Sequence, residues 1–521
     1  MRRRTKDVKR FIGVVFKIVF SRTMITLILL LIQLFWLIAG FRWLEEYSEV
    51  YLAVMVSVSA ALLIYIINKD EMPEFKLAWV IPICATPVFG ALLYLFIVGD
   101  WTNLGMKKRL NKRRKETEEF LHTDERTRKR MEISSTHMAN LSRYVEAEGG
   151  FPSYGGASVT YFPTGEEKFA DLLKELKDAK EFIFLEYFIV ERGRMWNCVL
   201  EILKEKVKEG VEVRFMYDGM CSLLLLPYSY PKQLEACGIK TKMFSPIIPL
   251  LSTAQNNRDH RKILVIDGKT AYTGGVNMAD EYINEVVRFG HWKDAAIKVE
   301  GDAVKSFTLM FLQMWNISEA AEGDYSKYIR KSEKKAVRSS GFIIPYGDGP
   351  ATPENVAETI YMDVVNQATN YVHIMTPYFI VDNAMLDVLQ YAARRGVDVK
   401  LIVPHIPDKK AVFAISRTYY PDLLGAGVKV YEYEPGFIHA KVFVSDDEKA
   451  VVGTVNLDYR SLYHHFECGV YLYRNEAVAD VEADFAKTLK SCIEINMAYY
   501  KKIPVLLRLT GRVLRLFGPL M

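Results

Sequence analysis

One short pattern of residues that could carry out phosphoryl-group chemistry occurs twice in the chain. The first copy is HRKILVID (260–267) and the second is HAKVFVSD (439–446), so each has His-x-Lys with Asp five residues after the lysine. Each copy runs on into a turn that contains an asparagine, Asn277 or Asn456, at the same interval from the histidine. A single His-x-Lys is a weak signal, but two copies with matching Asp and Asn are a specific one.

These residue types suit a reaction at a phosphodiester. The residues after each histidine alternate as in a strand, which places the histidine and the lysine on one face. A lysine supplies positive charge for phosphoryl oxygens, and an asparagine amide and backbone N–H groups can donate to others. A neutral imidazole can attack phosphorus, and a second, protonated imidazole can protonate the leaving group. We therefore predict a catalytic set of His260, Lys262, Asp267, His439, Lys441 and Asp446, with Asn277 and Asn456 binding the phosphate.

Two members of that set have a supporting role. We expect Asp267 and Asp446 to hold local structure rather than to act on the substrate. Nothing in the motifs requires a metal or an organic cofactor. The six cysteines are scattered without a Cys-x-x-Cys pair, so we expect reduced thiols rather than disulfides, zinc ligands or redox chemistry.

Strand–helix–strand segments precede each motif and must position it. FIFLEYFIV (182–190), a helical run and VEVRFMYDG (211–219) come before the first copy. YVHIMTPYFIV (371–381), a helical run and VDVKLIVP (397–404) come before the second, so the letters YFIV recur. This order indicates a right-handed βαβ unit in each half. We predict an α/β fold with two pseudo-two-fold related halves, each a mixed sheet flanked by helices, at 151–335 and 336–495.

Hydrophobic and basic segments flank these two halves. Three apolar stretches, at 24–41, 51–67 and 77–98, are each close to the ~20 residues that a membrane-crossing helix needs. We predict an N-terminal membrane region at 1–105, with two to three hydrophobic helices, and a basic linker at 106–150. Segment 496–521 mixes Leu, Val and Phe with Lys and Arg. That mixture suits either a basic amphipathic helix lying on an anionic membrane or a helix packed on the α/β halves.

Basic residues set the predicted orientation in the membrane. Clusters at 2–10 and 107–115 both favour the cytoplasmic side, whereas three full spans would separate them. Either one stretch does not cross, or one cluster departs from the positive-inside tendency. We predict a multi-pass protein of the cytoplasmic membrane, with its catalytic region in the cytoplasm.

The paired motifs resemble the HKD motifs of the phospholipase D superfamily, and nearly the whole chain is similar to bacterial cardiolipin synthases. The segments that carry the resemblance are LEYFIV (185–190), YDGMCS (217–222), NNRDHRKILVIDG (256–268), TGGVNMADEY (273–282), TPYFIVD (376–382), GFIHAKVFVSD (436–446) and GTVNLDYRSL (453–462). The chain departs from the family pattern at Cys221, where a small residue is expected, and at His464-His465, where Leu-Asn is more frequent. Both departures bear on the acceptor that the site prefers.

The resemblance implies transphosphatidylation. One phosphatidylglycerol is attacked at phosphorus by a histidine, and a second phosphatidylglycerol then takes the phosphatidyl group, which gives cardiolipin and glycerol. In such enzymes an acidic side chain orients each imidazole, and Asp294 and Glu467 are the candidates here. The resemblance also favours His260 as the nucleophile and His439 as the acid. The expected partners are phosphatidylglycerol, cardiolipin and an anionic membrane, with no nucleic acid.

Other functions remain open at the level of sequence. A phospholipase D that uses water, or a phosphatidyltransferase with another alcohol acceptor, would need the same residues. The apolar stretches argue against a nuclease of the superfamily, and the complete motifs argue against an inactive scaffold. No Asp-rich metal motif of the CDP-alcohol transferase type is present, which argues against the nucleotide-dependent route to cardiolipin.

Overall fold

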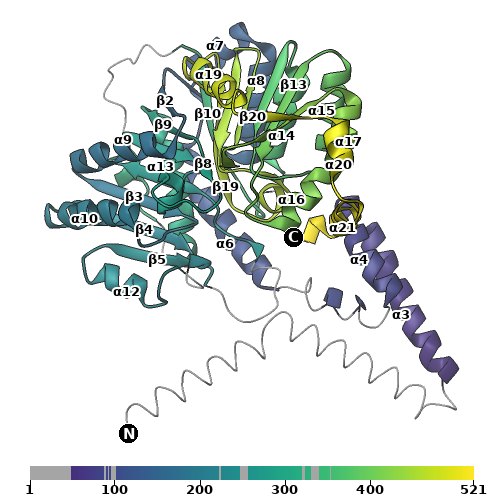
Figure 1. Ribbon diagram of the computed structural model, residues 1–521. Coiled ribbons are helices and arrows are strands. Elements are labelled where there is room, and N and C mark those ends of the chain that lie inside the picture. Colours follow the sequence, from purple (N-terminus) through teal and green to yellow (C-terminus); the bar gives the residue numbers. More distant parts are fainter. Residues whose placement is uncertain are drawn as a thin grey trace. The chain divides into compact units, whose positions relative to one another are not determined.

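The computed structural model describes residues 48–86, 90–91, 93–95, 101–221, 225–246, 256–319, 323–329, 340–352 and 354–520. These residues fall into two compact units. The larger unit comprises the described residues of 106–246 and 257–515, and it contains both copies of the motif. Figure 1 shows the helices and strands of the chain.

The smaller unit is built on two apolar helices, α3 (Ser48–Asn68) and α4 (Pro73–Ala85), with the short turn η9 (Gly518–Leu520) against α4. Its core contains Ile66, Trp79, Ile83 and Tyr94. The predicted stretch 51–67 lies within α3, 77–98 overlaps α4, and 24–41 lies outside the described residues. Among the helices that the structure describes, none has the length and apolar character that crossing a membrane requires. The predicted membrane-spanning helices are therefore not confirmed.

Two mixed sheets form the centre of the larger unit. The first has the order β2 (Ser158–Phe162), β9 (Ala296–Glu300), β7 (Thr270–Gly274), β6 (Lys262–Ile266), β3 (Phe182–Tyr187), β4 (Glu212–Asp218) and β5 (Lys240–Phe244). The second has the order β1 (Tyr154–Gly155), β10 (Phe342–Asp348), β19 (Glu467–Tyr473), β17 (Lys449–Gly453), β16 (Val442–Ser445), β11 (Tyr371–Met375), β13 (Asp398–Pro404), β14 (Lys429–Tyr433) and β20 (Cys492–Ile495).

The same path runs through both sheets. The series β9-β7-β6-β3-β4-β5 corresponds strand by strand to β19-β17-β16-β11-β13-β14. In each half three neighbouring strands are parallel, and the motif strand, β6 or β16, pairs antiparallel with the first of them. The predicted α/β fold with two related halves and mixed sheets is confirmed. The strand β1 lies in the range predicted for the first half but joins the second sheet.

Helices cover the sheets of both halves (Figure 1). They are α9 (Gly165–Asp178), α10 (Arg194–Lys208), α12 (Tyr230–Glu235) and α13 (Val304–Trp315) in the first half, and α14 (Val356–Gln367), α15 (Asn383–Arg394), α16 (Lys410–Ser416), α17 (Tyr420–Ala426), α18 (Tyr459–Tyr463) and α19 (Ala477–Leu489) in the second. The parallel pairs are joined by α10 and α15, as the predicted βαβ units require. Helix α9 begins where Thr164 accepts a hydrogen bond from the Glu167 amide at 3.2 Å, an N-cap interaction.

One helix lies between the two sheets. Every residue of α13 from Ser306 to Trp315 is buried, and the helix contacts β3, β6 and β7 of the first sheet and β10 of the second. A helix that is apolar all round needs such an enclosed position. Apolar surface on both sheets is therefore buried against a single shared element.

The predicted basic linker is helical and contacts both halves, through α6 on the first and through α8 and η3 on the second. It comprises α6 (Trp101–Thr117), η2 (Glu118–Phe120), α7 (Glu125–Ser134), α8 (Thr136–Tyr144) and η3 (Val145–Gly149). Arg113 Nε donates to the Asn316 carbonyl at 3.0 Å, and Gln313 Nε2 donates to Thr117 Oγ1 at 2.7 Å. The linker is thus held at the C-terminal end of α13.

Short elements complete the larger unit. They are β8 (His291–Lys293), β12 (Phe379–Ile380), β15 (Gly436–Ile438), β18 (Leu457–Asp458), η5 (Asp280–Ile283), η6 (Asn316–Ser318), η7 (Ser326–Tyr328), η8 (Arg417–Tyr419), α20 (Met497–Lys502) and α21 (Val505–Arg515). Strand β8 of the first half pairs in parallel with β15 of the second, and Asp259 forms a bridge with Phe466. These two contacts join the halves, one just before His260 and the other just before His439.

Candidate active site

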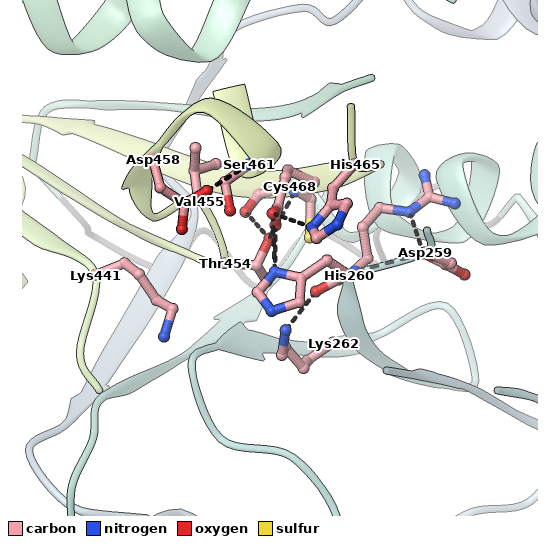
Figure 2. Close-up of polar contacts among 12 residues, drawn as sticks. Asp259, His260, Lys262, Lys441, Thr454, Val455, Asp458, Ser461, His465 and Cys468 are labelled. Atoms are coloured by element: carbon pink, nitrogen blue, oxygen red, sulfur yellow. Dashed lines mark hydrogen bonds and ion pairs between the residues drawn. The ribbon is translucent and has the colours of Figure 1, made fainter. Parts of the chain in front are cut away.

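The two motif strands carry their histidines and lysines into the interior of the larger unit. His260 precedes β6 and His439 precedes β16, and both histidines and the two lysines that follow them are buried. Lys262 Nζ donates to the His260 carbonyl at 2.5 Å, and Lys441 Nζ donates to the His439 carbonyl. Figure 2 shows Lys262 and Lys441 on the side of His260 where its Nε2 points. The arrangement places two ammonium groups beside the paired imidazoles.

Each histidine pairs with a carboxylate from the opposite half. Nδ1 of His260 lies 2.8 Å from Oε1 and 2.9 Å from Oε2 of Glu467, at the start of β19. Nδ1 of His439 lies 2.7 Å from Oδ2 of Asp294, which follows β8. Both carboxylates are fully buried. Sequence reasoning selected these two acids, but it did not predict that the pairs cross between the halves.

The backbone repeats the same crossing. The amide of His260 donates to the Phe466 carbonyl at 2.9 Å, and the amide of His439 donates to the Lys293 carbonyl at 2.6 Å. In both cases the acceptor is the residue just before the pairing carboxylate. The contacts between the halves therefore fix the histidine backbone and its ring together, which holds Nε2 free on the other side of each ring.

The second residue of each Gly-x-Val-Asn turn lies beside one of the two carboxylates, but it is Thr454 in one turn and Gly275 in the other. Thr454 Oγ1 donates to Oε2 of Glu467. At the matching position, Gly275, an added Cβ would lie 1.9 Å from Oδ1 of Asp294. A side chain is thus excluded beside Asp294, whereas one is used beside Glu467. Comparing the two copies residue by residue exposes this difference in the sequence, although its role emerges only from the geometry.

Burial and mutual charge shift the pKa values of the site. Burial lowers the pKa of Lys262 to about 8 and that of Lys441 to about 7. Burial, then the positive charges of Lys262 and Lys441, hold the pKa of His260 well below its usual value. Burial and Lys441 lower the pKa of His439 to about 4, although Asp294 acts in the opposite direction. Each imidazole has a buried carboxylate at its Nδ1, Glu467 for His260 and Asp294 for His439, and such a contact favours the protonated form of either ring.

The two motif aspartates bind backbone instead. Asp267 and Asp446 both have positive φ angles, 52° and 55°. The Asp267 carboxylate accepts from the amides of residues 180, 181 and 182 at 2.9, 2.7 and 2.9 Å. The Asp446 carboxylate accepts from those of residues 369, 370 and 371 at 2.7, 2.9 and 2.9 Å. Each carboxylate therefore ties the turn after a motif strand to the start of the neighbouring antiparallel strand, β3 or β11.

The two asparagines differ in their contacts. Asn277 Oδ1 accepts from the Ile189 amide at 3.0 Å, and its Nδ2 donates to the Tyr282 hydroxyl at 2.7 Å. Asn456 Oδ1 is buried and makes no hydrogen bond. Phosphate binding by these residues stays a prediction, and it is the amide hydrogens rather than the oxygens that suit it.

Aromatic rings that sequence reasoning did not select surround the histidines. The ring of Phe188 lies 4.9 Å from that of His260, and Trp292 and Tyr282 lie 5.3 and 5.5 Å from His439. Phe188 belongs to the repeated YFIV letters, and Trp292 lies two residues before Asp294. Both residues could therefore have been selected from the sequence, Phe188 by the repeat and Trp292 by its closeness to Asp294. The rings exclude water from the imidazoles, which strengthens their contacts with the carboxylates.

Comparison with known families decides the relationship. A family model described as "Cardiolipin synthase, PLD-like domain" matches residues 172–315 and 361–489, so it spans both halves and both motifs. The chain belongs to the cardiolipin synthase family of phospholipase D-like proteins. A second model, described as "Phospholipase_D-nuclease N-terminal", matches residues 58–99.

Several known proteins are similar to this chain over nearly their whole length. A cardiolipin synthase of Alkalihalophilus pseudofirmus is 35% identical over 92% of this chain and 95% of its own. A cardiolipin synthase of Geobacillus kaustophilus is 32% identical over 94% and 95%. A protein of Streptococcus mutans described as uncharacterized is 48% identical over 88% of this chain and 99% of its own.

A solved structure supports the same fold. The crystal structure of phosphatidylserine synthase from Haemophilus influenzae matches with a TM-score of 0.56 and 14% sequence identity. The match covers 73% of this chain and 98% of the other. At that identity the likeness shows a shared fold, in agreement with the family assignment.

Proposed function

We propose that this chain transfers a phosphatidyl group from one phosphatidylglycerol to another and so makes cardiolipin and glycerol. The observation that carries the proposal is the pair of crossed His–carboxylate contacts beside two buried lysines. The site offers one imidazole for attack on phosphorus, another for proton transfer, and positive charge for the phosphoryl oxygens. The family to which the chain belongs supports the choice of lipid.

In the first step, Nε2 of His260 attacks the phosphorus of phosphatidylglycerol. Glu467 holds the proton of this imidazole on Nδ1, so that the Nε2 lone pair faces the phosphorus. The bond from phosphorus to the glycerol oxygen breaks, and His439 gives its proton to that oxygen. The phosphodiester is an anion, which raises the pKa of His439 once the lipid binds and makes it a competent acid at neutral pH.

In the second step, a headgroup hydroxyl of another phosphatidylglycerol attacks the phosphatidyl-histidine. His439 takes the hydroxyl proton, the bond from phosphorus to Nε2 breaks, and His260 is neutral again. The resemblance to related enzymes supports His439 as the group that gives and takes the proton, with Asp294 at its Nδ1. The phosphodiester energy is kept in the intermediate, so no activated nucleotide donor is needed.

The reaction itself can be tested with purified protein in detergent. Labelled phosphatidylglycerol, supplied alone with a chelator, should give cardiolipin and free glycerol in equal amounts. Added glycerol should drive the reaction backwards, because one intermediate accepts either alcohol. Phosphatidic acid as the main product would instead indicate hydrolysis. No product until CDP-diacylglycerol and a metal are added would indicate the nucleotide-dependent route.

We propose further that the chain works at the cytoplasmic membrane as a multi-pass protein, with the catalytic region in the cytoplasm. The apolar sequence before residue 100 and the family match at 58–99 support this proposal. Labelling of cysteines in intact cells tests the orientation. Reaction of Cys198 or Cys237, which are exposed in the larger unit, with an impermeant reagent from outside would contradict it.

The C-terminal helix α21 supports contact with an anionic membrane. It packs on α16 through Gly511, where a Cβ would lie 2.5 Å from the Ala414 carbonyl. The opposite face exposes apolar side chains, among them Leu506 at 76% and Leu509 at 56%. Exposed basic residues accompany this face: Arg512 lies on α21, and Lys501 and Lys502 end α20 just before it. An apolar stripe with a basic border suits insertion at the level of the lipid headgroups.

A further inference from the structure

A third imidazole lies beside the catalytic pair and has no part in the proposed reaction. His465 is buried, with 7% of its surface exposed, and neither of its ring nitrogens makes a hydrogen bond. Leaving a buried polar group without a hydrogen-bond partner is unfavourable. Each nitrogen of His465 therefore has hydrogen-bonding or ligand capacity that no hydrogen bond in the described protein satisfies.

Nδ1 of His465 faces Glu467, the carboxylate that also contacts His260. Nδ1 of His465 lies 3.8 Å from Oε1 of Glu467, and its ring centroid is 5.4 Å from that of His260. Figure 2 shows the rings of His260 and His465 close together beside Thr454. Within the described residues, His260, His465 and Glu467 form a group whose nitrogen and oxygen ligand atoms all lie within 4.8 Å of one another.

We propose that these three side chains form a binding site for a divalent transition-metal ion, with Zn²⁺ as the preferred ion, and that the bound ion blocks catalysis. Two imidazole nitrogens and a carboxylate oxygen are a donor set that zinc accepts, at about 2.0–2.2 Å from the metal. Neighbouring tetrahedral ligands then lie about 3.3 Å apart, so small side-chain rotations bring the three atoms into place. Magnesium and calcium prefer oxygen ligands and are expected to bind poorly.

The inhibitory effect rests on the proposed function, because it concerns the nucleophile. A metal bond to Nδ1 of His260 requires the Nδ1 lone pair. The proton that Nδ1 now shares with Glu467 must then move to Nε2, the other nitrogen of the neutral ring. Nε2 loses the lone pair that attacks phosphorus, and Glu467 changes from hydrogen-bond acceptor to metal ligand. One bound ion therefore removes both the nucleophile and its orienting group.

The chain provides a matched set of variants. His465→Asn removes the third ligand and introduces the residue that the family more often has at this position, and His464→Asn removes the adjacent imidazole, which is not part of the group. His465→Gln is a second removal with a longer side chain. Thermal unfolding of each variant without metal shows which of them fold as the unmodified chain does.

The test uses the full-length chain in detergent micelles. Calorimetric titration with Zn²⁺ and the visible absorption of bound Co²⁺ report binding independently of catalysis. We expect one ion per chain with nitrogen ligation. His465→Asn should lose more affinity than the about 10- to 100-fold that loss of an outer-shell partner of a ligand costs, and His464→Asn should keep its affinity. Zinc should inhibit cardiolipin formation, a chelator should reverse the inhibition, and His465→Asn should need about tenfold more zinc or greater.

Several outcomes would overturn the proposal. Equal affinity of folded His465 variants and the unmodified chain removes His465 as a ligand. Absence of binding by the unmodified chain removes the site. Tight binding without inhibition refutes the block of catalysis while leaving the binding result intact. If the chain instead makes phosphatidic acid, the proposed acceptor fails, but the metal titrations and the zinc sensitivity of that reaction still test the site.

Discussion

Nδ1 of His260 lies 2.8 Å from Oε1 of Glu467, although 207 positions separate the two residues in the chain. The equivalent contact, from His439 to Asp294, runs back from the second half to the first. Correct docking of the two halves is therefore a condition for both imidazoles to be oriented.

Replacing one orienting carboxylate should impair the histidine of the opposite half. Glu467→Gln keeps the shape of the side chain but no longer requires Nδ1 of His260 to carry the proton. We expect turnover to fall by about two to four orders of magnitude with little change in KM. Steady-state kinetics on the purified variant measures this, and Asp294→Asn is the matched variant for His439. A fall of less than about threefold in both variants would show that the carboxylates do not orient the rings.

The two histidines should be indispensable and grossly non-additive. His260→Ala and His439→Ala should each lower turnover by about 10⁴- to 10⁶-fold, and the double variant should be little worse, because the residues act as a unit. Rapid quenching with lipid labelled at phosphorus should trap the covalent adduct on His260. Trapping it on His439 instead would reverse the assignment of nucleophile and acid.

The two buried lysines should set the alkaline limit of activity. Burial lowers the pKa of Lys441 to about 7 and that of Lys262 to about 8. The charged form exists below these values, so kcat/KM, which reports the free enzyme, should fall as pH rises through 7 to 8. Lys441→Arg keeps its charge at every accessible pH. It should move the fall to higher pH even if its absolute rate is low, and an unchanged profile would exclude Lys441 as the titrating group.

The motif aspartates should affect stability more than chemistry. Asp267→Ala leaves the amides of residues 180, 181 and 182 without their acceptor. Loss of hydrogen bonds to a charged group should lower the free energy of unfolding by about 2–3 kcal/mol. Asp267→Asn is the control, because asparagine tolerates the positive φ and retains one acceptor oxygen. Denaturant unfolding of the two variants separates these effects, and equal stability of Asp267→Ala and the unmodified chain would contradict the structural role.

The exposed face of α21 should enter an anionic bilayer. Leu506→Trp introduces a fluorophore on that face, and Ile133→Trp introduces one at an exposed position of α7. In full-length protein reconstituted with brominated anionic lipids, the tryptophan at 506 should be quenched and the one at 133 should not. High salt should weaken the quenching, because basic residues attract the helix to the surface. Equal quenching at both positions would leave α21 as an ordinary packing helix.

Much of the fold was accessible from the sequence because it is repeated. The recurrence of YFIV and of His-x-Lys in the same order predicts two related halves, and the shared strand order of the two sheets confirms them. The pairing of Asp294 with His439 was not accessible. It depends on β8 pairing with β15 across the halves, and long-range contacts of this kind leave no periodic signal in a single sequence.

In the site, too, roles set by residues close in the sequence could be predicted, whereas roles set by contacts between distant residues could not. Residues inside the motifs could be selected by type and spacing, whereas Thr454, Tyr282 and Trp292 gain their roles from what the fold brings next to them. The positive φ angles of Asp267 and Asp446 belong to a turn whose partner strand starts far earlier in the chain. The backbone amides that these aspartates bind can be identified only once the pairing of the strands is known.

Crossed pairs also have a consequence for symmetry. A dimer of one repeated half, related by an exact two-fold axis, would contain the same histidine–carboxylate contact twice and could not vary one without the other. Covalent fusion of the halves removes that constraint. In this chain one contact has Glu467 supported by Thr454, and the other has Asp294 against the bare backbone of Gly275. Asymmetry of this kind would allow the two copies of the motif to act differently, as the proposed roles of nucleophile and acid require.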